Sequence, residues 1–276
     1  MITPKTILIT GCSTGIGYET AITLKERGHN VIASARNQDD VIRLKQEGLT
    51  AVQLDLADSS SINRGFNEAL ELAQGTIDVL FNNGAFGQPG AVEDLTRDVL
   101  RFQFETNLFG THELTNLVIP FMRKQGHGRI IYNSSILGLV AMRYRGAYNA
   151  SKYALEGLAD TLRLELDGSN IAVSLIEPGP ILTHFRQNSF ALYKKNIDCE
   201  NSFHRLTYQT MEERLQKEGA AVPFTLPASA VVKKVIHAVE SVRPKIHYYV
   251  TFPTYLFAFL KRILPAAWLD NLVKRV

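Results

Sequence analysis

Short apolar runs alternate with helical patterns along almost the whole of this 276-residue chain. Each run is bounded by turn residues and is about as long as a buried strand. Strands that alternate with helices pair in parallel and bury both faces of their sheet. We therefore expect an α/β fold, with a doubly wound parallel sheet of about seven strands and helices on both faces. The predicted strands are Thr6–Ile9, Val31–Ser34, Ala51–Leu54, Asp78–Phe81, Gly128–Asn133, Ile171–Ile176 and Lys245–Thr251.

The helical patterns between these strands place apolar residues on one face of each helix. With 45% hydrophobic and 21% charged residues, a chain of this length is ordinary for one large globular domain. We treat residues 1–276 as a single domain. The predicted helices are about Tyr18–Lys25, Asp39–Glu47, Ser61–Leu72, Val99–Arg123, Ala147–Leu166 and Pro227–Val242.

Charge and cysteine content argue against several classes of function. The net charge is only +3, so no general affinity for nucleic acid follows. Cys12 and Cys199 form neither a CxxC nor a zinc pattern, and the seven histidines include no pair at metal-ligand spacing. We expect a cytoplasmic protein without a disulfide framework, a metal, a signal peptide or a membrane-spanning helix.

A glycine-rich turn, Thr10–Gly17, joins the first predicted strand to the first helix. This geometry places main-chain N–H groups and a helix N-terminus where the pyrophosphate of a dinucleotide can bind. Gly11 allows the tight turn, Gly15 lets phosphate approach the backbone, and Gly17 lets the helix pack on the strand. A glycine turn in this place can also be only a turn, so the other strand ends must decide.

The end of the second strand selects the cofactor in such a site. An acidic residue there would bind the ribose 2′-hydroxyl and favour NAD. The chain has Arg36 instead, with no acid before Asp39, and a guanidinium can make a forked contact with a 2′-phosphate. We therefore predict a preference for NADP, assisted by Ser13 in the glycine turn. The alternative is an exposed arginine at a strand end.

Tyr148 and Lys152 lie four residues apart in one helical pattern, so they share a face of that helix. A phenol has an ordinary pKa near 10, and a nearby ammonium lowers it. A tyrosine adjusted in this way can act as general acid or base for a carbonyl/alcohol pair. The alternative is a half-buried tyrosine beside a solvated lysine.

Polar and small residues follow the other strands. Asp55 follows the third strand and could accept a hydrogen bond from an adenine amino group or cap the next helix. Asn83, Ser135 and the pair Pro178–Gly179 follow the fourth, fifth and sixth strands. The carboxyl ends of parallel strands meet at one edge of the sheet. We therefore expect these residues, the glycine turn and Arg36 to form one site.

Asn107 interrupts the apolar stripe of the Val99–Arg123 helix. A polar amide in an apolar stripe must find partners or cost stability. It is either a satisfied core asparagine or a local kink that holds a water molecule.

Two later segments depart from the alternation. Residues 181–222 lose the strand/helix alternation and mix aromatic with charged side chains, and a segment of this kind is usually a lid or binding loop. We expect a helical substrate-binding lid here. Residues 252–276 combine apolar and basic residues in an amphipathic pattern. This tail either packs on its own domain and closes a pocket or makes peripheral contact with a membrane surface.

Taken together, these motifs resemble those of the short-chain dehydrogenase/reductase family over nearly the whole chain. The likeness implies a Rossmann-type fold. One difference is the order N-N-G-A at residues 82–85, where the family usually has N-N-A-G; exchanging two small residues should leave the backbone path intact. The matching elements are the T-G-x-x-x-G-x-G turn at Thr10–Gly17, Asp55, Asn82–Ala85, Asn107, Ser135, Tyr148-x-x-x-Lys152 and Pro178–Gly179.

The resemblance implies roles for these residues. Tyr148 would be the general acid in reduction and the base in oxidation, and Lys152 would lower its pKa and bind the nicotinamide ribose. Ser135 would position the carbonyl, and Asn107 would hold a water that links Lys152 to solvent. The residues implied to contact NADP are Gly11, Ser13, Thr14, Gly15, Ile16, Gly17, Arg36, Asp55, Leu56, Asn83, Gly84, Tyr148, Lys152, Pro178, Gly179, Ile181 and Thr183. Those implied to contact substrate are Ser135, Leu137, Tyr148, Phe185 and Phe190.

Within the family, the chain is similar to the branch that contains hydroxysteroid 17β-dehydrogenases, retinol dehydrogenases and bacterial NADP-dependent aldehyde reductases, and most of all to the last. This implies NADP(H)-dependent reduction of a hydrophobic aldehyde or ketone, or the reverse reaction, by a homodimer or homotetramer. The alternatives are an NADPH-binding regulator without turnover and a nucleotide-sugar epimerase or dehydratase. The latter usually carry a differently spaced glycine turn, T-G-x-x-G-x-x-G.

Overall fold

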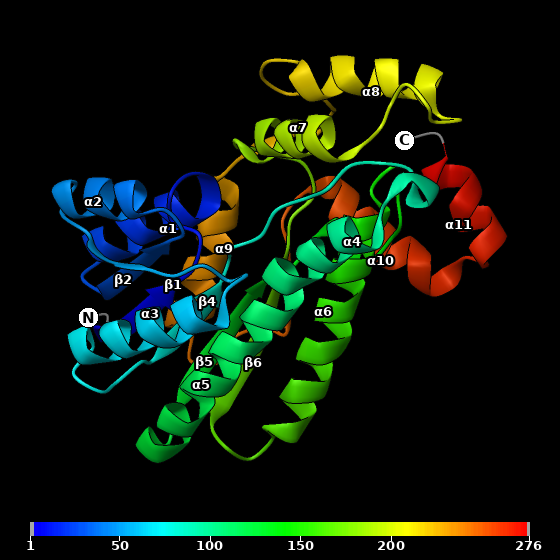
Figure 1. Cartoon of the computed structure of the whole chain (residues 1–276). Coiled ribbons are helices and arrows are strands. Elements are labelled where there is room, and N and C mark those ends of the chain that lie inside the picture. Colours follow the sequence, from blue (N-terminus) through cyan, green and yellow to red (C-terminus); the bar gives the residue numbers. More distant parts are fainter. Residues whose placement is uncertain (1–2, 275–276) are drawn as a thin grey trace.

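Seven strands form one parallel sheet in the computed structural model, which describes residues 3–274 (Figure 1). Their order is β3-β2-β1-β4-β5-β6-β9, and each neighbouring pair is parallel. The predicted fold class is therefore confirmed, and every predicted strand is present. The strands are β1 (Thr6–Ile9), β2 (Asn30–Ala35), β3 (Thr50–Gln53), β4 (Val79–Asn82), β5 (Gly128–Asn133), β6 (Ile171–Glu177) and β9 (His247–Tyr249).

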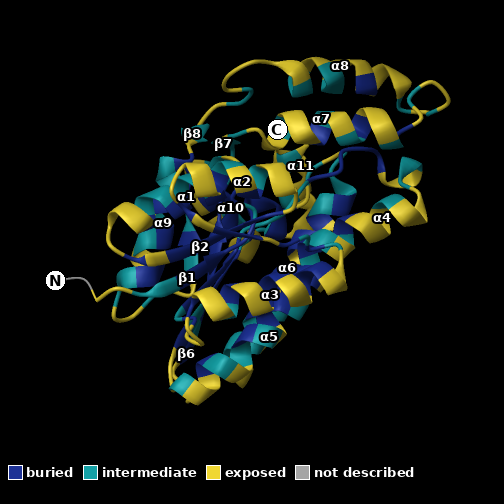
Figure 2. Ribbon diagram, turned by 60° about the vertical axis from the view of Figure 1, so that its left-hand side comes forward, coloured by how far each residue is buried: buried dark blue, intermediate teal, exposed yellow. Residues whose placement is uncertain are grey.

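Alternate residues of a strand point to opposite faces of the sheet, and β1 shows how this builds two cores. Ile7 and Ile9 pack into one core, whereas Leu8 packs into the other. The helices over the first core are α1 (Gly15–Glu26), α2 (Gln38–Gln46) and α9 (Ser229–Glu240). Those over the second are α3 (Ser59–Leu72), α5 (Gly110–Gln125) and α6 (Gly146–Glu165). Figure 2 shows the buried sheet between these layers and their exposed outer faces.

The predicted helix Val99–Arg123 is not continuous. Its first part, α4 (Arg97–Phe104), passes into a π-helical turn, Glu105–Phe109, before α5 begins at Gly110. A π-helical turn widens the helix locally and often occurs at functional sites. Asn107 lies inside this turn and is buried, so the polar interruption in the sequence coincides with the break in the helix.

The predicted helical lid is present, because residues 181–222 contain two helices. α7 (Phe185–Asn196) and α8 (Arg205–Gln216) pack side by side beyond the carboxyl ends of the strands (Figure 1). Tyr193 of α7 meets Tyr208 of α8 with ring centroids 5.5 Å apart. Each helix buries very few residues, and so few buried positions leave no clear helical period in the sequence.

The two ends of the lid are held together by a small parallel sheet. β7 (Ile181–Leu182) pairs with β8 (Leu226–Pro227). This pairing fixes where the lid leaves and rejoins the domain, next to α9.

The predicted helical tail consists of two helices, α10 (Phe252–Ile263) and α11 (Ala266–Val273), separated at Pro265. Arg275 and Val276 of the predicted tail lie outside the described residues. None of the helices within residues 3–274 combines the length and the apolar composition that crossing a bilayer requires.

Candidate active site

The glycine turn lies where β1 ends and α1 begins, and two of its glycines have no room for a side chain. Gly11 has φ +70°, and a Cβ on it would lie 2.7 Å from Gly84 Cα. A Cβ on Gly17 would lie 2.3 Å from the carbonyl oxygen of Gly11. Only glycine fits at these two positions. The turn thus keeps the open main-chain surface that a pyrophosphate requires.

A chain of hydrogen bonds connects this turn to Lys152. Thr10 Oγ1 accepts from the main-chain N–H groups of Asn83 and Gly84, both at 2.9 Å. The Asn83 side chain donates to the carbonyl oxygen of Thr10 and accepts from the Asn133 side chain, again at 2.9 Å. Lys152 Nζ donates to the carbonyl oxygen of Asn133 at 2.7 Å. The ends of β1, β4 and β5 and helix α6 are therefore fixed relative to one another.

The first residues of the lid lie on the glycine turn. A Cβ on Gly15 would be 3.3 Å from the Thr183 side chain. Ile181 packs with Ile16 against the core under α1, and Thr14 is exposed at the N-cap of that helix. The structure thus brings these five predicted cofactor residues together, although they come from two distant parts of the sequence.

The N-N-G-A order after β4 places a glycine, Gly84, where a side chain would collide with Leu56. A Cβ on Gly84 would lie 2.8 Å from Leu56 Cδ1. Glycine at this position therefore leaves room for Leu56, which is 6% exposed, beside the glycine turn.

Asp55 stays half-buried at the end of β3. Its Oδ1 accepts a hydrogen bond from the N–H of Ala57 at 3.0 Å. The N-cap of α3 is Asp58, whose side chain accepts from Ser60. The alternative that Asp55 caps this helix is therefore wrong.

Two arginines lie near the glycine turn. Arg36 directly follows the end of β2, where the sequence placed it, and its side chain is exposed. Arg43 of α2 was not predicted, and its Nη2 donates to the carbonyl oxygen of Ser13 at 2.5 Å. Asp40 and Glu47 form ion pairs with Arg43, so Arg36 is the better placed of the two to meet an additional anion.

Ser135 and Tyr148 lie next to each other at the ends of β5 and α6. The Ser135 hydroxyl accepts from the N–H of Leu137 at 3.1 Å and is close enough to hydrogen-bond Tyr148. The loop after β6 supports this corner, because the N–H of Ile136 donates to the carbonyl oxygen of Pro178 at 2.8 Å. A Cβ on Gly179 would meet Thr251 Oγ1 at 2.1 Å, so this loop also packs closely against the residue that precedes α10.

The prediction that Tyr148 has a lowered pKa is wrong. Burial raises the pKa of Tyr148 to about 12, and the Ser135 hydrogen bond and the charge of Arg145 only partly oppose this. Lys152 Nζ lies 5.6 Å from the centre of the Tyr148 ring and bonds Asn133 instead. Burial lowers the pKa of Lys152 to about 8, against the charge of Glu156.

Asn107 has all of its bonds within the protein. Its Oδ1 accepts from the N–H of Phe86 at 3.1 Å. Its Nδ2 donates to the carbonyl oxygen of Phe86 at 2.9 Å and to Ser151 Oγ at 3.2 Å. Asn107 is thus a satisfied core asparagine and also lies in a local break of the helix, and the water stays a prediction.

Apolar side chains surround Tyr148 on the substrate side. Phe185 of α7 meets its ring edge-on with centroids 5.4 Å apart. Leu137 and Phe257 of α10 belong to the same apolar cluster as Tyr148. Phe190 does not join them, because it stacks on Tyr193 inside the lid. Phe257 was missed in the sequence, where the tail offered no signal of which residues face the site.

Three ionisable residues that the sequence did not single out converge near Lys152, and one of them, Glu156, follows it by four residues on α6. Atoms of Glu156, Glu177 and His247 lie within 4.8 Å of one another, and His247 Nδ1 is 2.6 Å from Glu177 Oε1. Burial and the nearby Glu177 raise the pKa of Glu156 to about 7. The nearby Ser134 hydroxyl and the charge of His247 only partly oppose this rise. Glu156, Glu177 and His247 come from α6, β6 and β9, so no local spacing in the sequence could have indicated this cluster.

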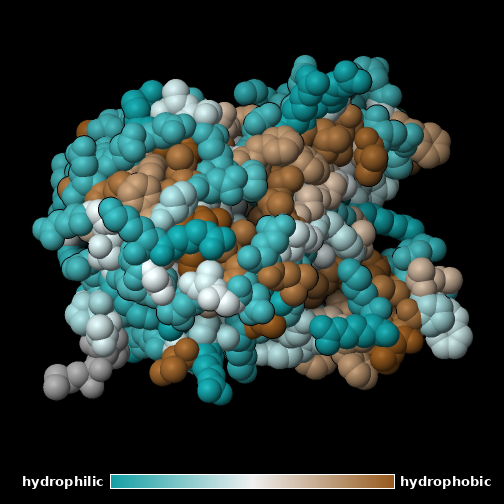
Figure 3. Space-filling view, turned by 90° about the horizontal axis from the view of Figure 1, so that it is seen from below, coloured by the Kyte–Doolittle hydropathy of each residue, from teal (hydrophilic) through white to brown (hydrophobic). Residues whose placement is uncertain are grey.

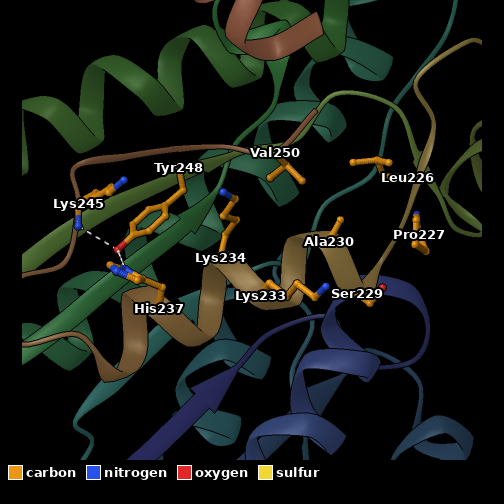
Figure 4. A pocket seen from close by; sticks show the side chains of 10 residues that line it. All are labelled: Leu226, Pro227, Ser229, Ala230, Lys233, Lys234, His237, Lys245, Tyr248 and Val250. Atoms are coloured by element: carbon orange, nitrogen blue, oxygen red, sulfur yellow. Dashed lines mark hydrogen bonds between the residues drawn. The ribbon is translucent and has the colours of Figure 1, made fainter. Parts of the chain in front are cut away.

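A surface pocket of about 530 Å³ lies elsewhere, between α9 and the segment that contains β9 (Figure 4). Its polar side chains include Lys233, Lys234 and His237, and Tyr248 bonds His237 across its floor at 2.8 Å. Its lining residues include none of the predicted catalytic residues. The candidate site is therefore defined by convergent side chains and not by this pocket.

Comparison with known proteins agrees with this arrangement. The family described as "short chain dehydrogenase" matches residues 5–194. The Escherichia coli K12 protein "Uncharacterized oxidoreductase YbbO" is 42% identical over 98% of this chain and 94% of its own length. Human "Retinol dehydrogenase 8" is 36% identical over 66% of this chain and 60% of its own. A Burkholderia phymatum short chain dehydrogenase/reductase, solved in complex with NAD, shares the fold with a TM-score of 0.78 at 22% identity, over 95% of this chain and 93% of its own.

Proposed function

This chain belongs to the short chain dehydrogenase family and is an oxidoreductase, and from this we propose that it interconverts a hydrophobic aldehyde or ketone and the corresponding alcohol with NADP(H). The observation that carries the proposal is the juxtaposition of Ser135, Tyr148 and Lys152. All three lie at the ends of β5 and α6, in hydrogen-bonded continuity with a glycine turn that has no room for a Cβ.

The residues present fit a nicotinamide dinucleotide. Gly11 and Gly17, which leave no room for a Cβ, would border the pyrophosphate, and Lys152 would bind the nicotinamide ribose. When bound, the cofactor supplies a hydride to the carbonyl carbon or accepts one from the alcohol.

Tyr148 is the proton carrier in this proposal. Because burial holds its pKa at about 12, the phenol is protonated at neutral pH, which is the form that carbonyl reduction needs. In that direction Tyr148 Oη donates its proton to the carbonyl oxygen while Ser135 orients that oxygen by a hydrogen bond. In oxidation the proton moves the other way. Protonated Lys152 stabilises the phenolate that forms when the proton leaves.

Arg36 supports the choice of NADP. It is exposed at the end of β2, where a 2′-phosphate would lie and where NAD enzymes of this fold have an acid. The structural relative in complex with NAD shares the fold but decides nothing about this position.

An apolar substrate is supported by the side chains around Tyr148. Leu137, Phe185 and Phe257 offer no charged or hydrogen-bonding group to a substrate. The name of the human relative, retinol dehydrogenase, refers to an apolar alcohol. We therefore extend the proposal to long-chain or otherwise hydrophobic carbonyl compounds.

The test is a steady-state assay of NADPH oxidation with straight-chain aldehydes of increasing length, a ketone and a steroid. We expect kcat/KM to rise with chain length. Tyr148→Phe should lower kcat by about 10²–10⁴-fold with NADPH binding intact. Tyr153→Phe is the control, because Tyr153 lies on the same helix but donates its hydroxyl to the carbonyl oxygen of Leu139. Retained turnover in Tyr148→Phe would contradict the assignment. NADPH binding without turnover on any carbonyl would favour a regulator.

A further inference from the structure

The outer face of α10 is apolar, which is unusual for a surface helix. Five large residues lie on it at helical spacing and are between 38% and 60% exposed. A helix on the surface of a domain normally turns polar residues outward. The residues of this stripe are Phe252, Tyr255, Leu256, Phe259 and Ile263.

The inner face of the same helix is also apolar and covers the candidate site. Thr254, Phe257 and Ala258 are buried. Phe257 shares a cluster with Leu137 and with the ring of Tyr148. α10 therefore has two apolar faces, one in the same cluster as Tyr148 and one that is largely exposed.

Neighbouring segments enlarge the outer stripe. Trp268, the only tryptophan of the chain, is 66% exposed on α11, and Leu272 on the same helix is 40% exposed. The exposed Phe224, at the end of the lid, packs on Phe252 with ring centroids 5.1 Å apart. We call this surface the tail patch: Phe224, Phe252, Tyr255, Leu256, Phe259, Ile263, Trp268 and Leu272.

Part of this apolar surface is visible in Figure 3. Brown and tan atoms gather along the right-hand edge, on the side where α10 and α11 lie in Figure 1. Teal atoms lie among them. The patch is thus a mixed apolar and polar surface and not a closed groove.

The charges around the tail patch are mostly positive. Lys261 and Arg262 occupy the last turn of α10, and Lys274 follows α11. Asp270 is the only acidic residue between 252 and 274. Lysine is depleted at protein–protein interfaces. Phe and Trp on one face with Lys and Arg beside them are instead the composition of helices that lie in a lipid interface.

We propose that the tail patch binds the surface of an anionic lipid bilayer, with α10 and α11 lying in the headgroup region. The aromatic side chains enter the boundary of the acyl chains, and the three basic residues meet lipid phosphates and carboxylates. Because the inner face of α10 covers Tyr148, this orientation places the candidate site directly above the membrane. An apolar substrate could then reach the site from the membrane, and this part of the inference rests on the proposed function. The binding of the tail patch to lipid does not depend on it.

The experiment is co-sedimentation of the full chain with phosphatidylcholine vesicles, with and without phosphatidylserine. We expect binding to the anionic vesicles, weaker binding to the neutral ones, and loss of binding as salt rises. Phe259→Ser and Trp268→Ser should each lower the partition coefficient about tenfold or more, since each removes one large apolar side chain from the interface. Arg262→Glu should remove the preference for anionic vesicles. Leu164→Ser is the control, because Leu164 is 67% exposed at the far end of α6.

Two results would overturn this inference. The first is an absence of sedimentation with anionic vesicles at low salt. The second is a particle mass in light scattering that corresponds to a dimer and falls in Phe259→Ser, without lipid binding, because the tail patch would then bind a second copy of the chain. Turnover of a short water-soluble aldehyde, measured without vesicles, keeps the two proposals apart. Its absence would count against the proposed function, whereas vesicle binding is measured without any reaction.

Discussion

Asn107 and Phe86 form a closed pair, in which the asparagine amide both donates to and accepts from the main chain of Phe86. The pair joins the π-helical turn between α4 and α5 to the segment that follows β4. That segment begins with Asn83 and Gly84, which line the glycine turn. The buried amide of Asn107 therefore fixes the main chain that follows β4, and this stretch of main chain borders the glycine turn.

Asn107→Ala should destabilise the protein by about 2–3 kcal/mol, because it leaves the N–H and the carbonyl of Phe86 without their partner. Urea unfolding measures this. Asn116→Ala is the control, since Asn116 is exposed on α5 and bonds only His112, and it should change stability by less than about 0.5 kcal/mol. Equal effects of the two substitutions would show that the Asn107 bonds contribute little.

Arg36→Ala should weaken NADPH far more than NADH, because only NADPH carries the 2′-phosphate. Loss of one charge-assisted contact corresponds to roughly a 10–100-fold rise in Kd for NADPH. Titration of both cofactors by fluorescence measures the ratio. Lys45→Ala, an exposed cation on the neighbouring helix α2, should leave both Kd values unchanged. Equal weakening of NADPH and NADH by Arg36→Ala would mean that this arginine has a structural role.

The sequence was sufficient to predict the sheet and the positions of Tyr148 and Lys152, because both depend on short-range order. A short run of apolar residues is enough to indicate a buried strand, and two residues four apart in a helix lie on the same face. The glycine turn was predictable for the same reason: Gly11 and Gly17 contact each other across a few residues of chain.

What the sequence could not give depends on contacts between distant elements. The raised pKa of Tyr148 follows from burial. Phe185 of the lid packs on the Tyr148 ring, and Phe257 of the tail belongs to the same apolar cluster. Phe190 has the same composition signal as Phe185 but turns toward Tyr193. The bounds of the two lid helices could not be read from periodicity, because each helix buries very few residues.

Glu156→Gln tests the pH dependence that the raised pKa of Glu156 implies. Its pKa rises from the ordinary 4.5 to about 7 in the fold. The folded state therefore binds this proton more tightly than the unfolded state. The resulting stability is fully present below pH 4.5 and is lost as the pH rises through about 7. Wild type should lose up to about 3 kcal/mol relative to Glu156→Gln between these limits.

The measurement is urea unfolding of both proteins from pH 4.5 to 8. The difference between the two proteins reports the charge of Glu156 together with its coupling to Glu177, His247, Asp160 and Lys152, because these groups interact with that charge only in wild type. Glu165→Gln, at the exposed end of the same helix, should show no such trend. A stability difference that is independent of pH would show that Glu156 is ionised in the fold over this whole range.

Substitution by alanine should have opposite effects on stability at Gly110 and at Gly157. Gly110 begins α5 directly after the π-helical turn, and a Cβ there would lie 1.8 Å from the carbonyl oxygen of Leu56. Gly157 lies inside α6, where a Cβ would meet nothing within 4 Å. Gly110→Ala should therefore cost about 3 kcal/mol or more, because main chain must move. Gly157→Ala should raise stability by up to about 1 kcal/mol, because alanine favours helix.

Urea unfolding and NADPH titration of the two variants decide whether the approach of α5 to Leu56 matters. Leu56 also fills the space beside Gly84. A shift of its main chain in Gly110→Ala should therefore disturb the glycine turn and weaken NADPH as well as stability. Gly157→Ala should leave NADPH binding unchanged. Equal stability of the two variants would mean that α5 does not come this close to Leu56. The packing of Gly110 on Leu56, and of Leu56 beside the glycine turn, would then be incorrect.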